Sequence, residues 1–372
     1  MIFAKITKME DIKCSGNGMW SPKLDGEGTE LYNAVDELKT ILIQLGIAID
    51  GGKDSMSMHM TQCTRDKNNV IRNNVIKTPR TLVLSGYAPM DNVNHKVTPD
   101  FKNYGSDIIF VDLGYGKMRM GGCALKQYYN NLHGNPKSSP DFESPDFESS
   151  DFKEIFKIIQ NNIEFIKSGH DRSDGGLITT LCEMCFAGNM GCEIDFMIQG
   201  LDTLHSTILK FLFNEELGLL IEIDSIHTNT FIEQFKHINL PVYKIGKTNK
   251  QNNISIMING KSILNERMTI LRSYWEKTSY NIECKQIGAG LALDEYNLYN
   301  NLYYGLYNEL INIYNNIPSS IINELSLVTN KLNQIDICKP KVAILREEGS
   351  NGDSEMMSAF YCAGFDVYNL NM

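Results

Sequence analysis

The 372-residue chain lacks three features that would each indicate a particular class of protein. No apolar run reaches the ~18 residues that a membrane-spanning helix needs. There is no sustained block of Lys or Arg, and the formal net charge is −10, which argues against nucleic acid as a partner. The start of the chain, Met1 to Lys5, is too short for a signal peptide and runs straight into patterned sequence. We therefore expect a cytoplasmic protein with neither membrane nor nucleic-acid partners.

Cysteines are present, but not in an arrangement that favours disulfides or zinc. Their number, nine, is odd, and they are scattered along the chain, which indicates reduced thiols. Cys182 and Cys185 have the CxxC spacing of a metal site, but no second CxxC completes it. Because the pair lies within an apolar helical pattern, we interpret both as core residues, with metal binding as the less favoured alternative.

The chain does contain helical and strand patterns in alternation to about residue 262, which is typical of α/β or α+β proteins. Its length predicts two or three domains. Apolar residues spaced by three or four predict a helix over 27–45, ended by Gly46. Further helical patterns lie at 152–166 and 177–186, and strands are predicted at 47–49, 53–58, 81–88, 108–113 and 219–223.

Two later stretches differ in composition from the rest. Ser-Pro-Asp-Phe-Glu occurs twice between Lys137 and Phe152, which predicts a surface loop over 134–152. After about residue 262 the chain is rich in Asn, Tyr, Leu and Ile, which we interpret as a mostly helical connector. From residue 341 a strand, a glycine-containing loop, a helix and a strand open a doubly wound α/β domain. One such unit cannot bury both faces of its sheet, so we expect this domain to be incomplete at Met372.

The segment Gly169-His170-Asp171-Arg172-Ser173-Asp174-Gly175-Gly176 is the strongest candidate for a ligand site. It precedes a helical pattern that Ser173 or Asp174 can cap and that Gly188 can end. N–H groups at a helix start attract phosphate, glycines such as Gly175 and Gly176 let the backbone approach a ligand, and a carboxylate can hold the bridging magnesium. The segment predicts a site for a nucleotide with Mg²⁺; a capped helix after a turn is the alternative.

Three other places invite a functional interpretation. Lys53 and Asp54, after a glycine pair, could neutralise phosphate and orient a metal, or form a solvated ion pair at a turn. The glycines after Arg119 could bind an anion, although a β-turn is favoured. His170 could act as a general base, but no partner nucleophile is visible, which favours a hydrogen-bonded structural role.

Six collinear segments together resemble the long, glutamine-dependent form of phosphoribosylformylglycinamidine synthase. They are residues 11–17, 46–58, 169–191, 215–219, 275–279 and 342–353. The resemblance implies the second synthetase half and the start of the glutaminase domain. The implied folds are aminoimidazole ribonucleotide synthetase-like N- and C-type domains, a helical connector and the first β-α-β unit of a flavodoxin-like glutaminase. The corresponding boundaries are 1–100, 101–262 (with the 134–152 loop), 263–339 and 340–372.

The resemblance also implies an activity. This family uses ATP and glutamine to convert formylglycinamide ribonucleotide to formylglycinamidine ribonucleotide in purine biosynthesis. Its second half holds an auxiliary ATP or ADP with Mg²⁺, for which Asp171 would be a magnesium ligand and Ser173 a nucleotide contact. No catalytic residue is expected in this chain, since the family's glutaminase cysteine would follow Met372. The partners implied are the remaining synthetase and glutaminase domains, with glutamine and formylglycinamide ribonucleotide.

Some features depart from the family or leave alternatives open. Gly18 stands where the family usually has a large aromatic residue, and the other magnesium ligands of the family have no counterpart here. We therefore expect the isolated chain to bind nucleotide weakly and to be inactive. A truncated, non-catalytic interaction module is one alternative. Another is a relative that phosphorylates a small substrate, such as a thiamine-monophosphate or selenophosphate enzyme, which the tail at 341–372 argues against.

Overall fold

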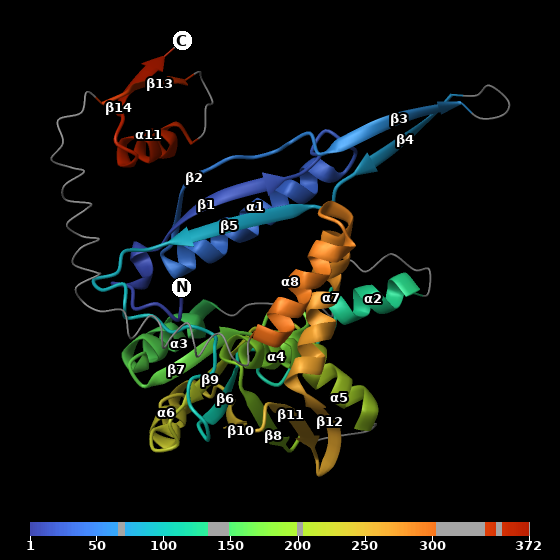
Figure 1. Cartoon of the computed structure of the whole chain (residues 1–372), viewed down its shortest axis with the longest axis vertical. Helices are drawn as coiled ribbons and strands as arrows, with labels where there is room; N and C mark the ends of the chain where they lie inside the picture. The colour runs from blue at the N-terminus through green and yellow to red at the C-terminus, as the bar shows by residue number, and fades with distance from the viewer. Residues whose placement is uncertain (66–70, 133–148, 199–203, 303–338, 347–351, 372) are drawn as a thin grey trace. The chain divides into compact units, whose positions relative to one another are not determined.

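The computed structural model of the protein describes residues 1–65, 71–132, 149–198, 204–302, 339–346 and 352–371 (Figure 1). Two compact units are distinguished, Met1–Asn300 and Asn301–Met372. The Ser-Pro-Asp-Phe-Glu repeat falls outside the described residues, as does the part of the expected connector from 303 to 338.

The N-terminal part of the first unit contains a three-stranded sheet in the order β2-β1-β5. Strand β1 (Lys13–Met19) runs parallel to β2 (Ala48–Gly52) and antiparallel to β5 (Thr81–Tyr87). Helix α1 (Glu27–Leu45) joins β1 to β2 and lies along the sheet in Figure 1. The predicted helix over 27–45 is confirmed, and Gly46 ends it in the left-handed conformation, with φ of 78°.

The segment after β2 differs from the prediction. Residues 53–58 were expected to form a strand, but Ser55 makes only an isolated bridge to Met19. The Asp54 carboxylate accepts a hydrogen bond from the Gly18 N–H at 2.8 Å, and the Ser55 N–H donates to the Gly18 carbonyl at 2.7 Å. An antiparallel hairpin follows, which the sequence patterns did not reveal; its strands are β3 (His59–Arg65) and β4 (Ile71–Lys77).

The larger sheet of the first unit has seven strands in the order β12-β11-β8-β10-β6-β9-β7. Their bounds are β6 (Asp107–Asp112), β7 (Ile166–Asp171), β8 (Gly191–Phe196), β9 (Gly218–Ile223), β10 (Val242–Asn249), β11 (Asn253–Ile258) and β12 (Lys261–Arg267). The central strands β6 and β9 are buried along their whole length, and these are the two that continuous apolar runs predicted.

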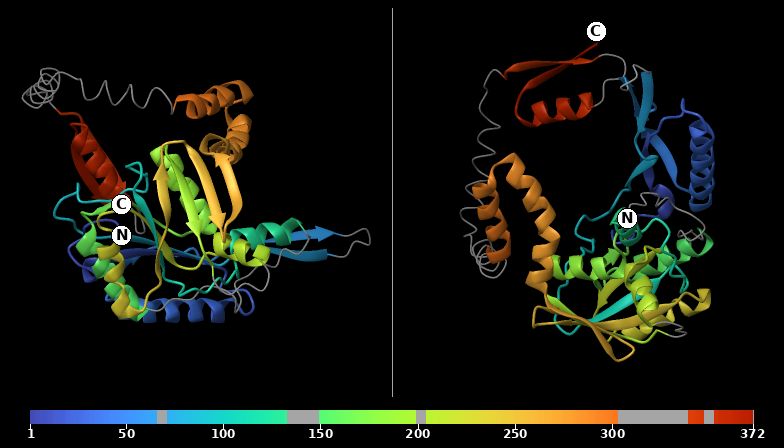
Figure 2. Two further views of the ribbon diagram at one scale, coloured as in Figure 1. Left: turned by 90° about the horizontal axis from the view of Figure 1, so that it is seen from below. Right: turned by 90° about the vertical axis from the view of Figure 1, so that its right-hand side faces the viewer.

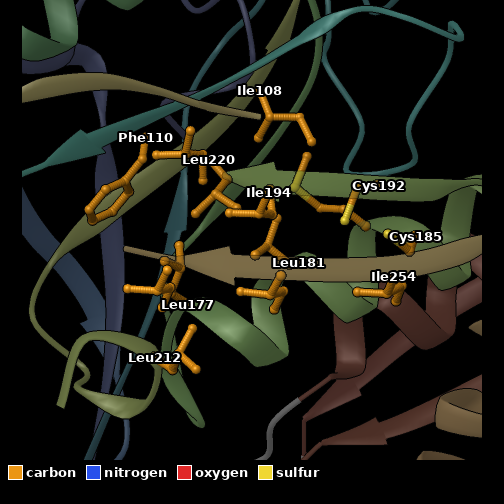
Figure 3. Close-up of a cluster of buried hydrophobic side chains, with 14 of the residues drawn as sticks. Ile108, Phe110, Leu177, Leu181, Cys185, Cys192, Ile194, Leu212, Leu220 and Ile254 are labelled. Atoms are coloured by element: carbon orange, nitrogen blue, oxygen red, sulfur yellow. The ribbon is translucent and has the colours of Figure 1, made fainter. Parts of the chain in front are cut away.

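Side-chain alternation along β6 divides the core into two layers. Ile108 and Phe110 pack with helices α4 (Gly176–Gly188) and α5 (Leu204–Phe213), as Figure 3 shows. Ile109 packs on the opposite face, with α3 (Ser149–Asn162) and α6 (Thr228–Glu233). Helix α3 begins at Ser149 rather than near Phe152, so the last residues of the expected 134–152 loop are helical. The sheet is therefore covered on both sides. Shorter elements are η1 (Met9–Asp11), α2 (Ala124–Leu132) and η2 (Lys236–Ile238).

The chain after the larger sheet is helical, as expected for a connector. Edge strand β12 extends to Arg267, across the expected boundary at 262. It leads into α7 (Met268–Gln286) and α8 (Ala289–Leu302), which lie side by side in Figure 2. The rings of Tyr280 and Tyr296 meet across the two helices with centroids 4.7 Å apart.

The second unit contains the predicted strand–helix–strand arrangement. Strands β13 (Lys341–Arg346) and β14 (Asp366–Asn371) are parallel neighbours, connected through α11 (Asp353–Cys362). Residues 347–351, in the loop that resembles the start of a glutaminase, are outside the described part.

Candidate functional site

The candidate nucleotide loop, residues 171–176, connects the end of β7 to the start of α4. The expected side-chain cap is wrong: neither Ser173 nor Asp174 caps the helix. The N-cap is Gly175, with φ of 85° and no side-chain cap hydrogen bond. At the other end, the helix includes Gly188 and is terminated by Asn189 in the left-handed conformation.

Gly176 is required by a close approach of two backbone segments. Its φ is +75°, and a Cβ built on it would lie 2.7 Å from the carbonyl oxygen of Leu212 and 2.7 Å from the carbonyl carbon of Phe213. No flexible side chain is involved, so a larger residue would force the backbone apart. The glycine therefore seats the start of α4 against the end of α5.

Asp171 and Ser173 are brought together by the loop. Both residues are exposed, and 66% of the Asp171 side chain is accessible. The Ser173 hydroxyl donates a hydrogen bond to the Asp171 carboxylate. A carboxylate and a hydroxyl thus stand side by side at the surface, both oxygen donors of the kind that magnesium and phosphate contacts use.

Arg172, between these two residues, points into the protein and anchors the loop. Its N–H donates to the Gly218 carbonyl at 2.7 Å, and Nη2 donates to the Leu217 carbonyl at 3.0 Å. The guanidinium also pairs with Asp112 at 3.2 Å and lies over the Phe110 ring, 4.9 Å from its centroid. Burial raises the pKa of Asp112, partly offset by Arg172, and lowers the pKa of Arg172. Removing either partner would leave the other charge buried without compensation.

A second charged pair lies behind the first. Nε and Nη2 of Arg119 donate to the two carboxylate oxygens of Glu216 at 2.7 and 2.8 Å, a bidentate arrangement, and the Glu216 side chain is fully buried. The Glu216 carbonyl also accepts a hydrogen bond from Arg172 Nε. Anion binding after Arg119 was the less favoured interpretation, and Arg119 is engaged by the carboxylate of Glu216.

Two N–H groups at the start of α4, those of Gly175 and Gly176, are engaged within the protein. Gly175 N–H donates to Oε1 of Glu215 at 2.8 Å, and Gly176 N–H donates to the Ser173 carbonyl at 3.0 Å. In this conformation these two N–H groups are therefore not free to hold phosphate. A nucleotide phosphate could instead meet Ser173 and a cation held by Asp171.

His170 supports the loop from the strand side. Its Nδ1 lies 2.7 Å from the Asp171 carbonyl oxygen, and its Nε2 lies 3.4 Å from a carboxylate oxygen of Glu183. Both ring nitrogens therefore face partners of the protein itself. This arrangement agrees with the structural role that the sequence favoured over a general base.

Lys53 and its neighbour belong to the other sheet. The Lys53 N–H donates to the Gly16 carbonyl at 2.9 Å, and the side chain is exposed. In the part of the chain that the structure describes, no hydrogen bond or ion pair joins Lys53 to the nucleotide loop. Asp54 is occupied by the Gly18 N–H, which gives this carboxylate a role in the turn.

The two cysteines with metal-site spacing lie on α4 against the sheet. Burial raises the pKa of Cys182 to about 12 and that of Cys185 well above its usual value, so both thiols stay protonated. Among the described residues, no group of three or more His, Cys, Asp or Glu side chains could hold a metal ion. Asp171 fits magnesium as one ligand of a shell that phosphate oxygens and further groups would complete. No helix within the described ranges is long and apolar enough to cross a membrane.

The buried charges around Arg172 were missed in the sequence. One signal was available in the sequence. If Asp171 and Ser173 face solvent at the end of a strand, the residue between them, Arg172, points inward, and its buried charge needs a carboxylate partner. Asp112 follows a continuous apolar strand, and Glu216 precedes another. What the sequence could not reveal is that β6, β7 and β9 are neighbours, which brings these charges together.

Three family models match successive parts of the chain. An FGAR-AT PurM_N-like domain covers residues 1–89, the C-terminal domain of AIR synthase related proteins covers 119–259, and a CobB/CobQ-like glutamine amidotransferase domain covers 339–372. The order is the one that the resemblance implied.

Characterised relatives are similar over the entire chain. Phosphoribosylformylglycinamidine synthase of Dictyostelium discoideum is 39% identical over 390 residues, covering 100% of this chain and 27% of that protein. The human enzyme is 33% identical, also over 100% of this chain and over 26% of its own length. Among solved structures, T. maritima PurL complexed with FGAR has a TM-score of 0.53 at 13% identity, covering 73% of this chain and 40% of that one, which shows a shared fold alone. The chain thus spans about a quarter of the length of the relatives it matches.

Proposed function

The chain belongs to the phosphoribosylformylglycinamidine synthase family, and we propose that it is the region of such a ligase that holds an auxiliary Mg²⁺–nucleotide. The complete enzyme would use ATP and glutamine to convert formylglycinamide ribonucleotide to formylglycinamidine ribonucleotide. Similarity along the whole chain and three family models in the expected order support this assignment. The proposed domains are an N-type domain over 1–100, a C-type domain over 101–262, a connector over 263–339 and the start of a glutaminase over 340–372.

The observation that supports the nucleotide site is the exposed Asp171–Ser173 pair, held in place by the buried Arg172 between them. Bound magnesium would offset the phosphate charge. Asp171 would be one of its ligands, and the Ser173 hydroxyl would contact the nucleotide. Gly175 and Gly176 would allow close approach of the ligand, and Lys53 remains a weaker candidate on the small sheet. This chain supplies no catalytic residue in the proposal.

The proposed compartment is the cytosol, where thiols are kept reduced. The eight cysteines within the described residues are free thiols, and their scattered positions give no disulfide framework. Glutamine, formylglycinamide ribonucleotide and the rest of the synthetase and glutaminase are the proposed partners.

Asp171→Asn in the full-length enzyme tests the nucleotide site. The variant keeps the size of the side chain and removes its charge, so we expect less Mg–ADP to be retained. Because a ligand that binds only the folded state stabilises it, the melting temperature should fall toward that of nucleotide-stripped protein. Turnover should fall only indirectly. The measurements are nucleotide content after extraction and thermal unfolding.

Asp174→Asn is the matched control, because it removes the same charge from an exposed residue of the same loop. His170→Gln is a second control beside the proposed ligand. Unchanged nucleotide content in Asp171→Asn would reduce Asp171 to a turn residue. A larger loss in His170→Gln would transfer the role to the histidine.

A further inference from the structure

The segment Asn214–Gly218, between α5 and β9, supports the nucleotide loop from behind. Asn214 Nδ2 donates to the carbonyls of Lys210 and Phe211 in the last turn of α5, which ends that helix. The next residues, Glu216 to Gly218, each give a carbonyl to Arg172. This short segment therefore fixes the residue that stands between Asp171 and Ser173.

Glu215 connects two helix starts within this segment. Its Oε1 accepts a hydrogen bond from Gly175 N–H at 2.8 Å and another from Ala124 N–H at 2.9 Å. Ala124 is the first residue of α2, and Gly175 is the N-cap of α4. A carboxylate is favourable at both places, because the N-terminal end of a helix carries partial positive charge. The side chain is half-buried, so water screens these contacts only in part.

We propose that Glu215 is a positioning residue for the Mg²⁺–nucleotide site, a role that rests on the proposed function. Its carboxylate holds Gly175 and thereby fixes the path of the chain from Ser173 into α4. Arg172 is anchored by backbone carbonyls and Asp112, without the Glu215 side chain. Asp171 and Ser173 are therefore held from both ends of the loop. Without Glu215 the C-terminal half of the loop loses its attachment to α2, and Ser173 is no longer held beside Asp171.

The test compares Glu215→Ala with Glu215→Gln in the full-length enzyme, stripped of nucleotide and titrated with Mg–ADP. The alanine variant loses both hydrogen bonds, so we expect affinity to fall about tenfold, the size of one hydrogen bond to a charged group. The glutamine variant keeps an oxygen that can accept from both N–H groups, and its affinity should stay within about twofold. Loss of two hydrogen bonds at helix starts should also lower the melting temperature of the stripped alanine variant. A purely structural role would lower the melting temperature without weakening the binding of Mg–ADP.

Two controls keep the result interpretable. Glu193→Ala removes an exposed glutamate on β8 and should leave affinity unchanged. If Glu215→Ala does not fold, Glu215→Asp replaces it, since its carboxylate is one methylene too short to reach both N–H groups and should weaken binding. Unchanged affinity in the shortened variant, or an equal loss in Glu215→Gln, overturns the positioning role. If Mg–ADP affinity falls in Asp171→Asn but not in Glu215→Ala, only this inference is overturned. If affinity falls in neither variant, the nucleotide site itself is overturned.

Discussion

Single residues set the shape of the candidate loop through one close backbone contact. Gly176 and Gly26 have nearly the same positive φ, +75° and +77°, and both stand at the start of a helix. Their surroundings differ. A Cβ on Gly176 would meet backbone atoms at 2.7 Å, whereas nothing lies within 4 Å of a Cβ on Gly26. A comparison of substitutions at Gly176 and Gly26 therefore separates the free energy of backbone strain from that of a steric clash.

We predict that Gly176→Ala destabilises the chain more than Gly26→Ala. Strain at positive φ costs about 1–2 kcal/mol for alanine at either position. The clash at Gly176 adds about 1–3 kcal/mol, because backbone must move to relieve it. Urea unfolding of both variants measures the two free energies. If both variants lose the same free energy of unfolding, the backbone between α4 and the end of α5 moves apart at no cost in stability.

The charges behind the loop show why residue roles were only partly predictable. Asp171 and Ser173 were found because the short glycine-rich segment places them next to a helical pattern. Arg172 was passed over, because its partners Asp112 and Glu216 are 60 and 44 residues away in sequence. A hydrogen bond between such residues depends on strand order, which local patterns do not contain.

At the scale of elements, a buried carboxylate joins helix α1 to the end of β4 and to the connection between β4 and β5. The Glu27 side chain is only 4% exposed and pairs with Lys77 and Arg80, with Arg80 Nε 3.0 Å from Oε2. The Trp20 indole N–H donates to the Glu27 carbonyl at 3.1 Å, and Arg80 lies over the Trp20 ring. The start of the helix, the hairpin and the sheet thus share one cluster.

This cluster predicts an acid-sensitive contribution to stability. Hydrogen bonds from Arg80 and Lys77 lower the pKa of Glu27 from 4.5 to about 2. Because the pKa is lower in the folded state, the contribution is full above pH 4.5 and is lost as pH falls toward about 2. Glu27→Gln should therefore lower the melting temperature at neutral pH, and the difference from wild type should shrink below pH 4.5.

Glu30→Gln is the control for the Glu27 experiment. Glu30 contacts the same Arg80 at 2.9 Å, but its side chain is 48% exposed, and exposed ion pairs contribute little. Its removal should change neither the melting temperature nor the pH profile by a comparable amount. A pH-independent gap between wild type and Glu27→Gln would show that the contribution comes from packing and not from charge.

Elements were predictable where a single hydrophobic period ran without interruption. Helix α1 and strands β5, β6 and β9 follow such periods and lie within a residue or two of the predicted ranges. The β3–β4 hairpin has a polar sequence with exposed apolar residues such as Met60 and Val75, so no period marks it. At 53–58 the Ser–Met alternation was real, but the backbone pairing with β1 stops at the isolated bridge between Met19 and Ser55.

At the scale of the first unit, apolar side chains of the β2-β1-β5 sheet are exposed to solvent. Leu82, Val83 and Leu84 of β5 are 42%, 44% and 38% exposed, and Ile49 on β2 is 42% exposed. Successive residues of a strand point to opposite faces, so both faces of β5 are partly open. Contiguous exposed apolar surface of this kind marks a place where another body packs. This supports the proposal that the remaining synthetase is a partner of this region.

We predict that the purified 372-residue chain does not form formylglycinamidine ribonucleotide from its precursor, with either glutamine or ammonia. The chain spans only about a quarter of its relatives, and Asp171 is the one magnesium ligand proposed within it. The segment that matches a glutaminase offers Cys362 as its thiol, which lies on helix α11 and not in a site with a paired base among the described residues. The assay is release of ADP and glutamate, with a full-length relative as positive control and buffer as blank. Turnover above the blank would contradict the proposal that this chain supplies no catalytic residue.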